Sequence, residues 1–270
     1  MPRLTVLVDN AGADGLASEW GLSMAVETGG GDLWLWDAGA SAKFLCNARA
    51  LGLDPSRARG LALSHGHYDH TGGIPALLDA GFSGPILVHP EANRPRYALH
   101  GGTIETVGIP VPLERFEPVN HARDLAPDLT FVTDIPRLPG LPQSIGGLCL
   151  DPGGRDQDTV PDDAFLLLQT ADGPVAVLGC CHAGLENTLA CLRERFGVRR
   201  LHGLVGGAHL YNADQKRLDG ALTALRDCGL ERLHLGHCTG EAAAAWLGER
   251  LGCRLEPLRP GLVLDFPAIP

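Results

Sequence analysis

Three histidines and one aspartate are grouped in the short segment His65-Gly66-His67-Tyr68-Asp69-His70. Imidazole and carboxylate groups are ligands for zinc, iron and manganese, and zinc binds them at about 2.0–2.2 Å. A solvated polar loop, or histidines that cap a helix, would be the alternative. The whole chain contains only 11 histidines, so three of them beside an aspartate are hard to ascribe to such a loop. The segment therefore predicts a site for transition-metal ions.

The elements on either side of this segment would position its side chains. Leu61-Ala62-Leu63-Ser64 is typical of a buried strand that ends at His65, and Thr71-Gly72-Gly73-Ile74-Pro75 is typical of the start of a helix. A loop that follows a rigid strand can bring several ligands together within coordination distance. We therefore expect the ligands on a strand-to-helix loop.

Two segments in the second half of the chain offer further donors, which a site with about four to six donors per metal would need. The first is Gly179-Cys180-Cys181-His182-Ala183-Gly184, which follows an apolar strand-like run and precedes a predicted helix. The second, Leu233-His234-Leu235-Gly236-His237-Cys238-Thr239-Gly240, repeats that arrangement. His182 and His237 are the natural candidates, although His182 could instead cap a helix and His237 could be a hydrogen-bonded core histidine.

The pattern His-x-His-x-Asp-His after an apolar strand, followed by Thr-Gly-Gly, resembles the signature of the metallo-β-lactamase superfamily. Four further motifs resemble one branch of it, the 7,8-dihydropterin-6-methyl-4-(β-D-ribofuranosyl)aminobenzene-5'-phosphate synthase-like metal-dependent hydrolases. They are Glu19-Trp20-Gly21-Leu22-Ser23, Gly-Cys-x-His-Ala-Gly at residues 179–184, Gly206-Gly207-Ala208-His209-Leu210 and Gly-His-Cys-Thr-Gly at residues 236–240. The similarity extends over nearly the whole chain.

This resemblance implies an α/β fold of the αββα sandwich type, with two mixed sheets face to face and helices outside. It also implies a ligand set in two groups. The first metal would be held by His65, His67 and His182, and the second by Asp69, His70 and His237. The cofactor would be one or two divalent ions, with zinc favoured and manganese, iron or magnesium as alternatives.

The sequence departs from the superfamily pattern at one ligand. Most members have an aspartate that bridges the two metals, whereas this chain has Gly179-Cys180-Cys181 in the comparable place. A thiolate there would be a softer ligand, and we consider Cys181 as an additional one; a missing bridge, with one tight and one weak metal, is the alternative.

Two residues are candidates for contact with substrate. His209 lies in a glycine-rich segment, and we consider it as an acid, an anion-binding residue or a further ligand, with an ordinary loop histidine as the alternative. Glu19 could bind substrate or hydrogen-bond a ligand histidine, or it could be an exposed loop glutamate.

Composition restricts the partners. The 270 residues carry a formal net charge of -10 and no apolar stretch long enough to span a membrane, so nucleic acid and anionic membranes are disfavoured and a small-molecule substrate is expected. The N-terminus enters a strand-like segment without the apolar core of a secretion signal, which predicts a cytoplasmic protein whose eight cysteines are thiols. The oligomeric state stays open.

Hydrophobic periodicity predicts sheet and then helix in both halves of a single domain over residues 1–270. Strands are expected at residues 4–8, 22–27, 33–36, 60–63, 165–169, 175–178, 201–205, 233–235 and 262–266. Helices are expected at residues 42–51, 185–196, 214–228 and 241–251, the last with Thr239 as its N-cap. Gly29-Gly30-Gly31-Asp32 predicts a hairpin. Residues 85–161 hold most of the 20 prolines and are expected to form loops and edge strands, as a lid over the substrate or as a surface excursion.

Three functions are compatible with these ligands. With two divalent ions the expected chemistry is hydrolysis, in which Asp69 ligates metal and orients water and His209 serves the leaving group. The resemblance suggests a transferase that releases pyrophosphate from a pterin diphosphate as the alternative. An iron redox protein, or a metal-binding module without turnover, is the third.

Overall fold

The computed structural model describes residues 1–110 and 116–269. Its first sheet has the strand order β17-β1-β2-β3-β4-β5-β8. The strands are β1 (Arg3–Val8), β2 (Ser23–Glu27), β3 (Leu33–Trp36), β4 (Gly60–Ala62), β5 (Ile86–Val88), β8 (Glu117–Pro118) and β17 (Val263–Asp265). Strands β17, β1, β2 and β3 pair antiparallel, whereas β3, β4, β5 and β8 pair parallel. The carboxyl ends of β3, β4 and β5 therefore lie at one edge of this sheet.

The second sheet has the order β16-β15-β14-β13-β12-β10-β9. The strands are β9 (Ala122–Ala126), β10 (Leu129–Val132), β12 (Phe165–Leu168), β13 (Val175–Leu178), β14 (Gly203–Gly206), β15 (Arg232–Leu235) and β16 (Arg254–Leu255). Strands β13, β14, β15 and β16 are parallel to one another, and the rest pair antiparallel. The segments that follow β13, β14 and β15 thus also leave the sheet at one edge.

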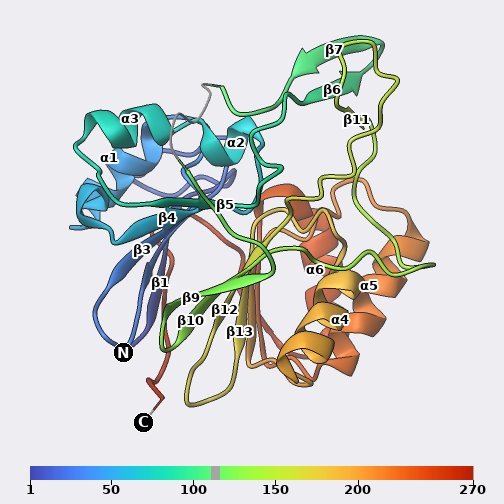
Figure 1. Cartoon of the computed structure of the whole chain (residues 1–270). Coiled ribbons are helices and arrows are strands. Elements are labelled where there is room, and N and C mark those ends of the chain that lie inside the picture. Colours follow the sequence, from blue (N-terminus) through green and yellow to red (C-terminus); the bar gives the residue numbers. More distant parts are fainter. Residues whose placement is uncertain (111–115, 270) are drawn as a thin grey trace.

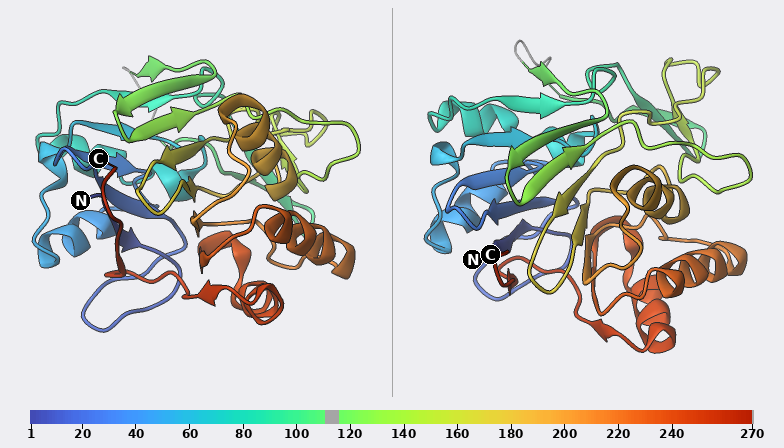
Figure 2. Two further views of the ribbon diagram at one scale, coloured as in Figure 1. Left: turned by 90° about the horizontal axis from the view of Figure 1, so that it is seen from below. Right: turned by 60° about the horizontal axis from the view of Figure 1, so that its bottom comes forward.

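Helices cover the outer face of each sheet, which gives four layers (Figures 1 and 2). On the first sheet lie α1 (Lys43–Ala50), η1 (Pro55–Arg57), α2 (Tyr68–Thr71) and α3 (Ile74–Asp79), and on the second lie α4 (Leu185–Phe196), α5 (Gln215–Asp227), η2 (His237–Thr239) and α6 (Glu241–Leu251). One apolar cluster fills the space between the sheets, where Trp36 packs edge-on against Phe131. Each of the two further clusters lies between one sheet and the helices that cover it. The expected αββα sandwich is confirmed.

Local sequence explains several of these elements. The hairpin predicted at residues 29–32 joins β2 and β3, and Gly31 has φ 87°, a conformation that glycine adopts freely. Asp214 caps α5 by accepting the Arg217 N–H, and α4 ends at Gly197 in the left-handed region.

Some sequence expectations were wrong in detail. Thr239 does not cap α6; Gly240 is its N-cap, and Thr239 Oγ1 instead accepts the Ala208 N–H at 2.9 Å. The helix expected to begin within residues 71–75 is α3, which starts at Ile74, but the ligand segment, expected to be a loop, contains the separate short helix α2, so Asp69 and His70 are helical.

The proline-rich region contains more sheet than expected. Besides β5 and β8–β10, it forms a separate small sheet of β6 (Tyr97–His100), β7 (Thr103–Thr106) and β11 (Leu148–Cys149), in the order β11-β6-β7. Figure 1 shows this small sheet projecting from the body of the molecule. Residues 111–115 of the region lie outside the described part of the chain. No helix among the described residues is both long and apolar enough to cross a membrane.

Candidate metal centre

The two sheets deliver the candidate ligands to a common edge. His65–His70 follows β4, Cys180–His182 follows β13, His209 follows β14 and His237 follows β15. These strands are central and parallel in their sheets, and their carboxyl ends are where α/β folds place binding sites. Segments far apart in the sequence therefore contribute side chains to one place.

Three imidazoles form a first group. His65 Nε2 lies 2.8 Å from His67 Nδ1, and the ring of His182 is within 5 Å of both rings (4.8 and 4.9 Å between centroids). One nitrogen from each of the three lies within 4.8 Å of the others. The His182 Nε2 atom is buried and has no hydrogen-bond partner among the described residues. A buried polar atom of this kind normally has a partner, so a bound cation suits this position.

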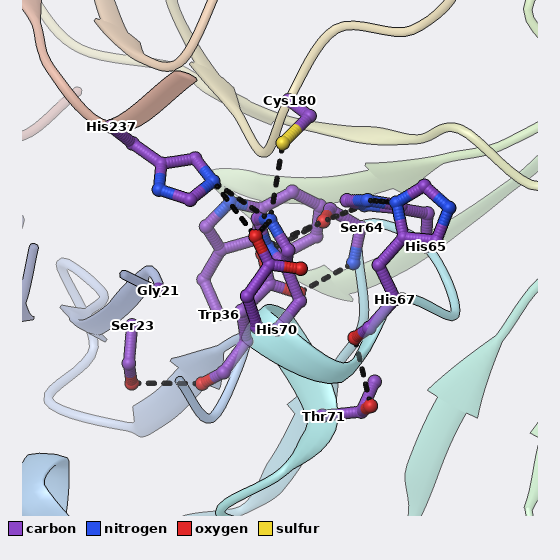
Figure 3. A network of polar contacts seen from close by, with 12 residues as sticks. Gly21, Ser23, Trp36, Ser64, His65, His67, His70, Thr71, Cys180 and His237 are labelled. Carbon is purple, nitrogen blue, oxygen red and sulfur yellow. Dashed lines mark hydrogen bonds and ion pairs between the residues drawn. The ribbon is translucent and has the colours of Figure 1, made fainter. Parts of the chain in front are cut away.

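A second group combines Asp69, His70 and His237. Figure 3 shows His70 and His237 of this group beside His65 and His67 of the first. His70 Nε2 lies 3.1 Å from His237 Nε2, and Asp69 Oδ2 lies 3.5 Å from the same His237 atom. Cys180 Sγ is 3.2 Å from His70 Nε2, and Cys180 also shares a potential ligand group with His65 and His70. The thiol thus lies between the two groups.

Three of these imidazoles are held in orientation by residues that do not belong to either ligand group. His70 Nδ1 contacts Asp37 Oδ2 at 2.7 Å, His237 Nδ1 contacts Asn10 Oδ1 at 3.0 Å, and His182 Nδ1 donates to the Ser144 carbonyl at 2.5 Å. Partners of this kind set the tautomer and the ring orientation of metal-binding histidines. In each of these three residues the other nitrogen, Nε2, is left for the centre.

Cys181 was expected as the additional sulfur ligand, and its placement corrects that expectation. Its side chain belongs to the apolar cluster beneath the helices, and its Sγ lies 3.4 Å from Thr188 Oγ1. Of these two cysteines, only Cys180 has its Sγ among the candidate ligand atoms of the described residues.

Burial controls the charge of the site. It lowers the pKa of His65, His67, His182 and His237 well below the usual value, which leaves their rings neutral with a lone pair free. Burial would do the same to His70, but the carboxylates of Asp37 and Asp69 outweigh it and raise the pKa of that ring. Burial also raises the pKa of Asp69. The four neutral rings can therefore donate lone pairs to a bound cation.

The family model described as the metallo-beta-lactamase superfamily matches residues 21–189. The chain belongs to the metallo-beta-lactamase superfamily. It is 28% identical to a 7,8-dihydropterin-6-methyl-4-(beta-D-ribofuranosyl)-aminobenzene-5'-phosphate synthase of Methanocaldococcus jannaschii, over 92% of this chain and 90% of the relative. The superfamily is enzymatic, and its fold implies divalent-metal binding.

Solved structures agree with this placement. A metal-dependent hydrolase of the beta-lactamase superfamily has a TM-score of 0.84 to this chain at 27% identity, covering 98% of this chain and 99% of the other. The metallo-beta-lactamase fold protein YhfI from Bacillus subtilis has a TM-score of 0.60 at 14% identity, covering 97% and 98%. The second likeness shows the fold of the superfamily alone.

A cavity of about 630 Å³ opens onto the two ligand groups of this superfamily member. Its inner wall includes His67, Asp69, Cys180, His182 and His209. The outer wall comes partly from the small sheet and its flanks, through Ala98, Glu105, Val107, Gly146 and Leu148. The proline-rich region thus faces the cavity. Of the two roles expected for it, a lid over the substrate would require this position.

His209 lies where the sequence predicted, beside the cluster. Its ring centroid is 4.5 Å from that of His182, and it lines the cavity. Its φ of 46° is unusual for a non-glycine residue. Burial lowers the pKa of His209 to about 4, so the ring is neutral near pH 7 and offers one N–H donor.

Glu19 does not line the cavity, which corrects its expected role at the substrate. Glu19 Oε1 accepts the N–H groups of Ala40 (2.9 Å) and Ser41 (3.1 Å), and its Oε2 accepts the Ser41 hydroxyl. The carboxylate therefore fixes the loop after β3. The next residue, Trp20, is the one that reaches the cavity.

A buried ion pair joins the small sheet to the ligand loop. Arg96 is fully buried, and its guanidinium donates to Asp158 at 2.9 Å and Asp162 at 2.6 Å. The other oxygen of Asp162 accepts the Gly66 N–H at 2.8 Å. The outer wall of the cavity is thereby held at a fixed position relative to His65 and His67.

Sequence reasoning missed Asp37, Asn10 and Ser144, and it considered Cys181 rather than Cys180 as the additional ligand. Asp37 had a signal, because it is a carboxylate directly after the strand predicted over residues 33–36. Asn10 and Ser144 lie in loops whose course the sequence pattern does not specify, and no motif distinguishes them. The sequence does not show which of the two adjacent cysteines faces inward, because this depends on the bend after β13, in which Cys181 has φ 59°.

Proposed function

We propose that this protein is a metal-dependent hydrolase that acts on a small metabolite, with phosphorylated compounds included. The observation that carries the proposal is the convergence of two ligand groups on one open cavity, with a shared thiol between them. Hydrolases with two metals need this arrangement, since one ion activates water while the other polarises the substrate. The name of the structural relative as a metal-dependent hydrolase supports it.

The residues present fit divalent ions. His65, His67 and His182 would hold one ion, and Asp69, His70 and His237 the other, with Cys180 as a further donor beside both groups. The unpartnered Nε2 of His182 supports the first assignment. Nitrogen, oxygen and sulfur donors together favour zinc over magnesium or manganese. When bound, the ions lower the pKa of water and act as Lewis acids toward a carbonyl or phosphoryl group.

The chain's own residues would orient and protect the reaction. Asp69 lines the cavity and orients the attacking water through its carboxylate. His209, which is neutral, donates its N–H to the substrate or to the leaving group. Trp20 and the small sheet line the cavity and would contact the part of the substrate that lies away from the ligands.

A transferase that releases pyrophosphate is the second candidate. One finding favours it: the relative in Methanocaldococcus jannaschii, similar over 92% of this chain, is named a synthase. The two functions use the same ligands, so the site does not separate them. They differ in whether an organic acceptor, rather than water, takes the transferred group.

The test is a substrate screen with the zinc-loaded protein and two variants. We expect turnover of at least one ester, thioester, lactone, lactam, phosphodiester or diphosphate without an added acceptor. His182→Ala should lose metal and activity together. His209→Asn should keep its metal and lose about 10²–10³-fold in kcat, the magnitude expected for removing one donor at a developing charge.

Other outcomes would contradict the proposal. Pyrophosphate release that requires a second organic substrate would establish the transferase. A metal-loaded protein that turns over none of these classes would refute hydrolysis, and a His209→Asn variant with unchanged kcat would remove His209 from the mechanism.

A further inference from the structure

A further group of possible ligands lies beside those of the proposed function and contains two sulfur atoms. It consists of Cys180, His237 and Cys238, and one donor atom from each lies within 4.8 Å of the others. Both thiols are free, and both side chains are buried. Cys180 and Cys238 also line the cavity of about 630 Å³. An ion can therefore reach the two sulfur atoms from that cavity.

The surroundings of these two thiols differ from those of other buried cysteines. Cys180 and Cys238 belong to none of the three apolar clusters formed by the described residues. Cys180 Sγ lies 3.2 Å from His70 Nε2, and Cys238 Sγ donates a long contact of 3.5 Å to the Cys180 carbonyl. Three other cysteines do belong to the apolar cluster between the second sheet and its helices, where a structural cysteine is usual: Cys181, Cys191 and Cys228. Apolar packing therefore does not account for the pair Cys180 and Cys238.

The backbone after β15 brings an imidazole and a thiol to the same place. His237 has φ 50°, a conformation that non-glycine residues rarely adopt, and it begins the single turn η2. On one side of this turn, Thr239 Oγ1 accepts the Ala208 N–H at 2.9 Å. On the other, the Cys238 carbonyl accepts the Tyr211 N–H at 3.1 Å. Backbone in such a conformation persists where its surroundings hold it, and it is common at functional sites.

Gly207 leaves the space that the Cys238 thiol occupies. A Cβ on Gly207 would lie 2.6 Å from Cys238 Sγ and 2.6 Å from the Gly179 carbonyl oxygen. Any side chain at residue 207 would therefore displace the sulfur atom. Because residue 207 is a glycine, Cys238 Sγ lies directly against the backbone and close to Cys180.

Two thiols and one imidazole are a donor set for soft divalent cations. Thiolates select zinc and softer ions, whereas manganese and magnesium prefer oxygen ligands. Two thiolates and a neutral imidazole carry two negative charges, which a divalent cation cancels, and a buried site is most stable when its charges are compensated. Two sulfur atoms on one tetrahedral zinc ion lie about 3.8 Å apart. Donor atoms within 4.8 Å of one another therefore need only a small adjustment.

We propose that Cys180, Cys238 and His237 form a soft-ion position in the metal centre, and that Cys238 gives the centre its preference for thiophilic divalent cations. His237 also belongs to the group with Asp69 and His70, so the two positions are alternatives for one ion. An oxygen-preferring ion such as Mn²⁺ takes the position at Asp69, and a thiophilic ion takes the position at the sulfur pair. Each thiol releases its proton when the ion binds.

This inference goes beyond the proposed function, because it concerns which ions the centre accepts and not which reaction follows. The test compares Cd²⁺ and Mn²⁺ binding to the metal-free full chain and to Cys238→Ser. Cadmium is thiophilic, and each cadmium–thiolate bond adds to a charge-transfer band in the ultraviolet. We expect Cys238→Ser to show about half of the parent's band at saturation, and Cys180→Ser combined with Cys238→Ser to show none.

The affinities for the two ions separate a ligand from a residue that only supports the fold. Cys238→Ser should weaken cadmium binding at this position by at least about tenfold, because the loss of a residue that merely supports a ligand already costs about 10–100-fold in metal affinity. Manganese affinity, measured from the electron paramagnetic resonance signal of free Mn²⁺, should stay unchanged. A variant with general structural damage would lose affinity for both ions.

Two other cysteines provide matched controls. Cys228 is buried in the apolar cluster beneath the helices, and Cys46 is an exposed thiol. Cys228→Ser and Cys46→Ser should both keep the full cadmium band and the parent's cadmium affinity.

Several outcomes would overturn the proposal: a full cadmium band in Cys238→Ser, an equal loss of manganese and cadmium affinity in that variant, or a loss of the band in Cys46→Ser. The readout does not depend on turnover. A protein that shows the predicted selectivity but hydrolyses nothing would refute the proposed function alone. A hydrolase whose cadmium band does not change in Cys238→Ser would refute the soft-ion position alone.

Discussion

At the scale of single residues, the site depends on imidazoles whose two nitrogens have different tasks. In His70, His182 and His237 one nitrogen is held by a carboxylate, a carbonyl or an amide oxygen, and the other is directed to the centre. The inward residues were predictable from sequence, because few side chains bind transition metals and they occur in tight motifs. The outer partners were not, because any loop oxygen at the right distance can take that role.

The adjacent cysteines provide a matched pair of substitutions. In the cobalt-substituted protein, a thiolate ligand gives a sulfur-to-metal charge-transfer band in the near-ultraviolet spectrum. We expect Cys180→Ser to remove or strongly weaken that band, because Cys180 Sγ lies among the ligand atoms. Cys181→Ser should keep it, because Cys181 is in the apolar cluster. Loss of the band in Cys181→Ser but not in Cys180→Ser would show that Cys181, and not Cys180, is the sulfur ligand.

His234 makes the stability of the folded protein depend on pH, and it is not one of the candidate metal ligands. It is fully buried, neither of its ring nitrogens has a hydrogen-bond partner among the described residues, and burial lowers its pKa to about 4. The unfolded chain, with a pKa of about 6.5, takes up this proton first. The stability due to the neutral ring is therefore present above about pH 6.5 and is lost as the pH falls toward 4.

The corresponding experiment is urea unfolding of the metal-free protein at pH 7 and pH 5. His234→Leu removes the titrating group, so the variant should lose less stability than the parent between these two pH values. All other titrating groups are common to both proteins. An identical loss in both would show that His234 does not contribute to the pH dependence.

At the scale of elements, the ligand loop is held in place by close backbone contact. A Cβ on Gly66 would lie 2.0 Å from the Ala92 carbonyl oxygen, and a Cβ on Gly179 would lie 2.1 Å from Ser64 Oγ. Neither glycine has a positive φ, so the requirement is for space and not for an unusual conformation. The sequence shows both glycines within the ligand motifs, but it does not show which atoms pack against them.

Gly66→Ala tests this packing. The methyl group would push the loop away from Ala92 and destabilise the protein by about 1–3 kcal/mol, as for other insertions into packed regions. His65 and His67 would move with the loop, so metal affinity should fall as well. Gly12→Ala is the control, since nothing lies within 4 Å of its Cβ position. Calorimetry and a metal titration would decide, and equal results for both variants would contradict the account.

Predictability differed between elements for a physical reason. Helices and strands with a buried face, such as α4 and β13, leave a periodic pattern that identified them within a few residues. The small sheet β11-β6-β7 does not, because β7 is largely exposed and its strands are short. The N-cap of α6 was misplaced because Thr239 uses its hydroxyl in a contact with Ala208 that is remote in sequence.

At the scale of the whole molecule, two sheets face each other and their parallel strands point to a common edge. In each sheet, some neighbouring strands pair antiparallel and the others pair parallel. The parallel strands end at the common edge, and the loops that follow them therefore lie there. Periodicity alone did not separate this arrangement from a single doubly wound sheet; the motifs did. Periodicity also did not predict which loops of the two sheets meet, because that depends on packing across the central apolar cluster; the resemblance of the ligand motifs did.

The central claim is that the two ligand groups hold metal ions. Elemental analysis of the purified protein beside His67→Ala tests it most directly, with His121→Ala as a control at a histidine whose side chain is 79% exposed. We predict near two equivalents of zinc in the parent and in His121→Ala, and a loss of at least one equivalent in His67→Ala. A parent protein without metal after reconstitution, or an unchanged metal content in His67→Ala, would contradict the account.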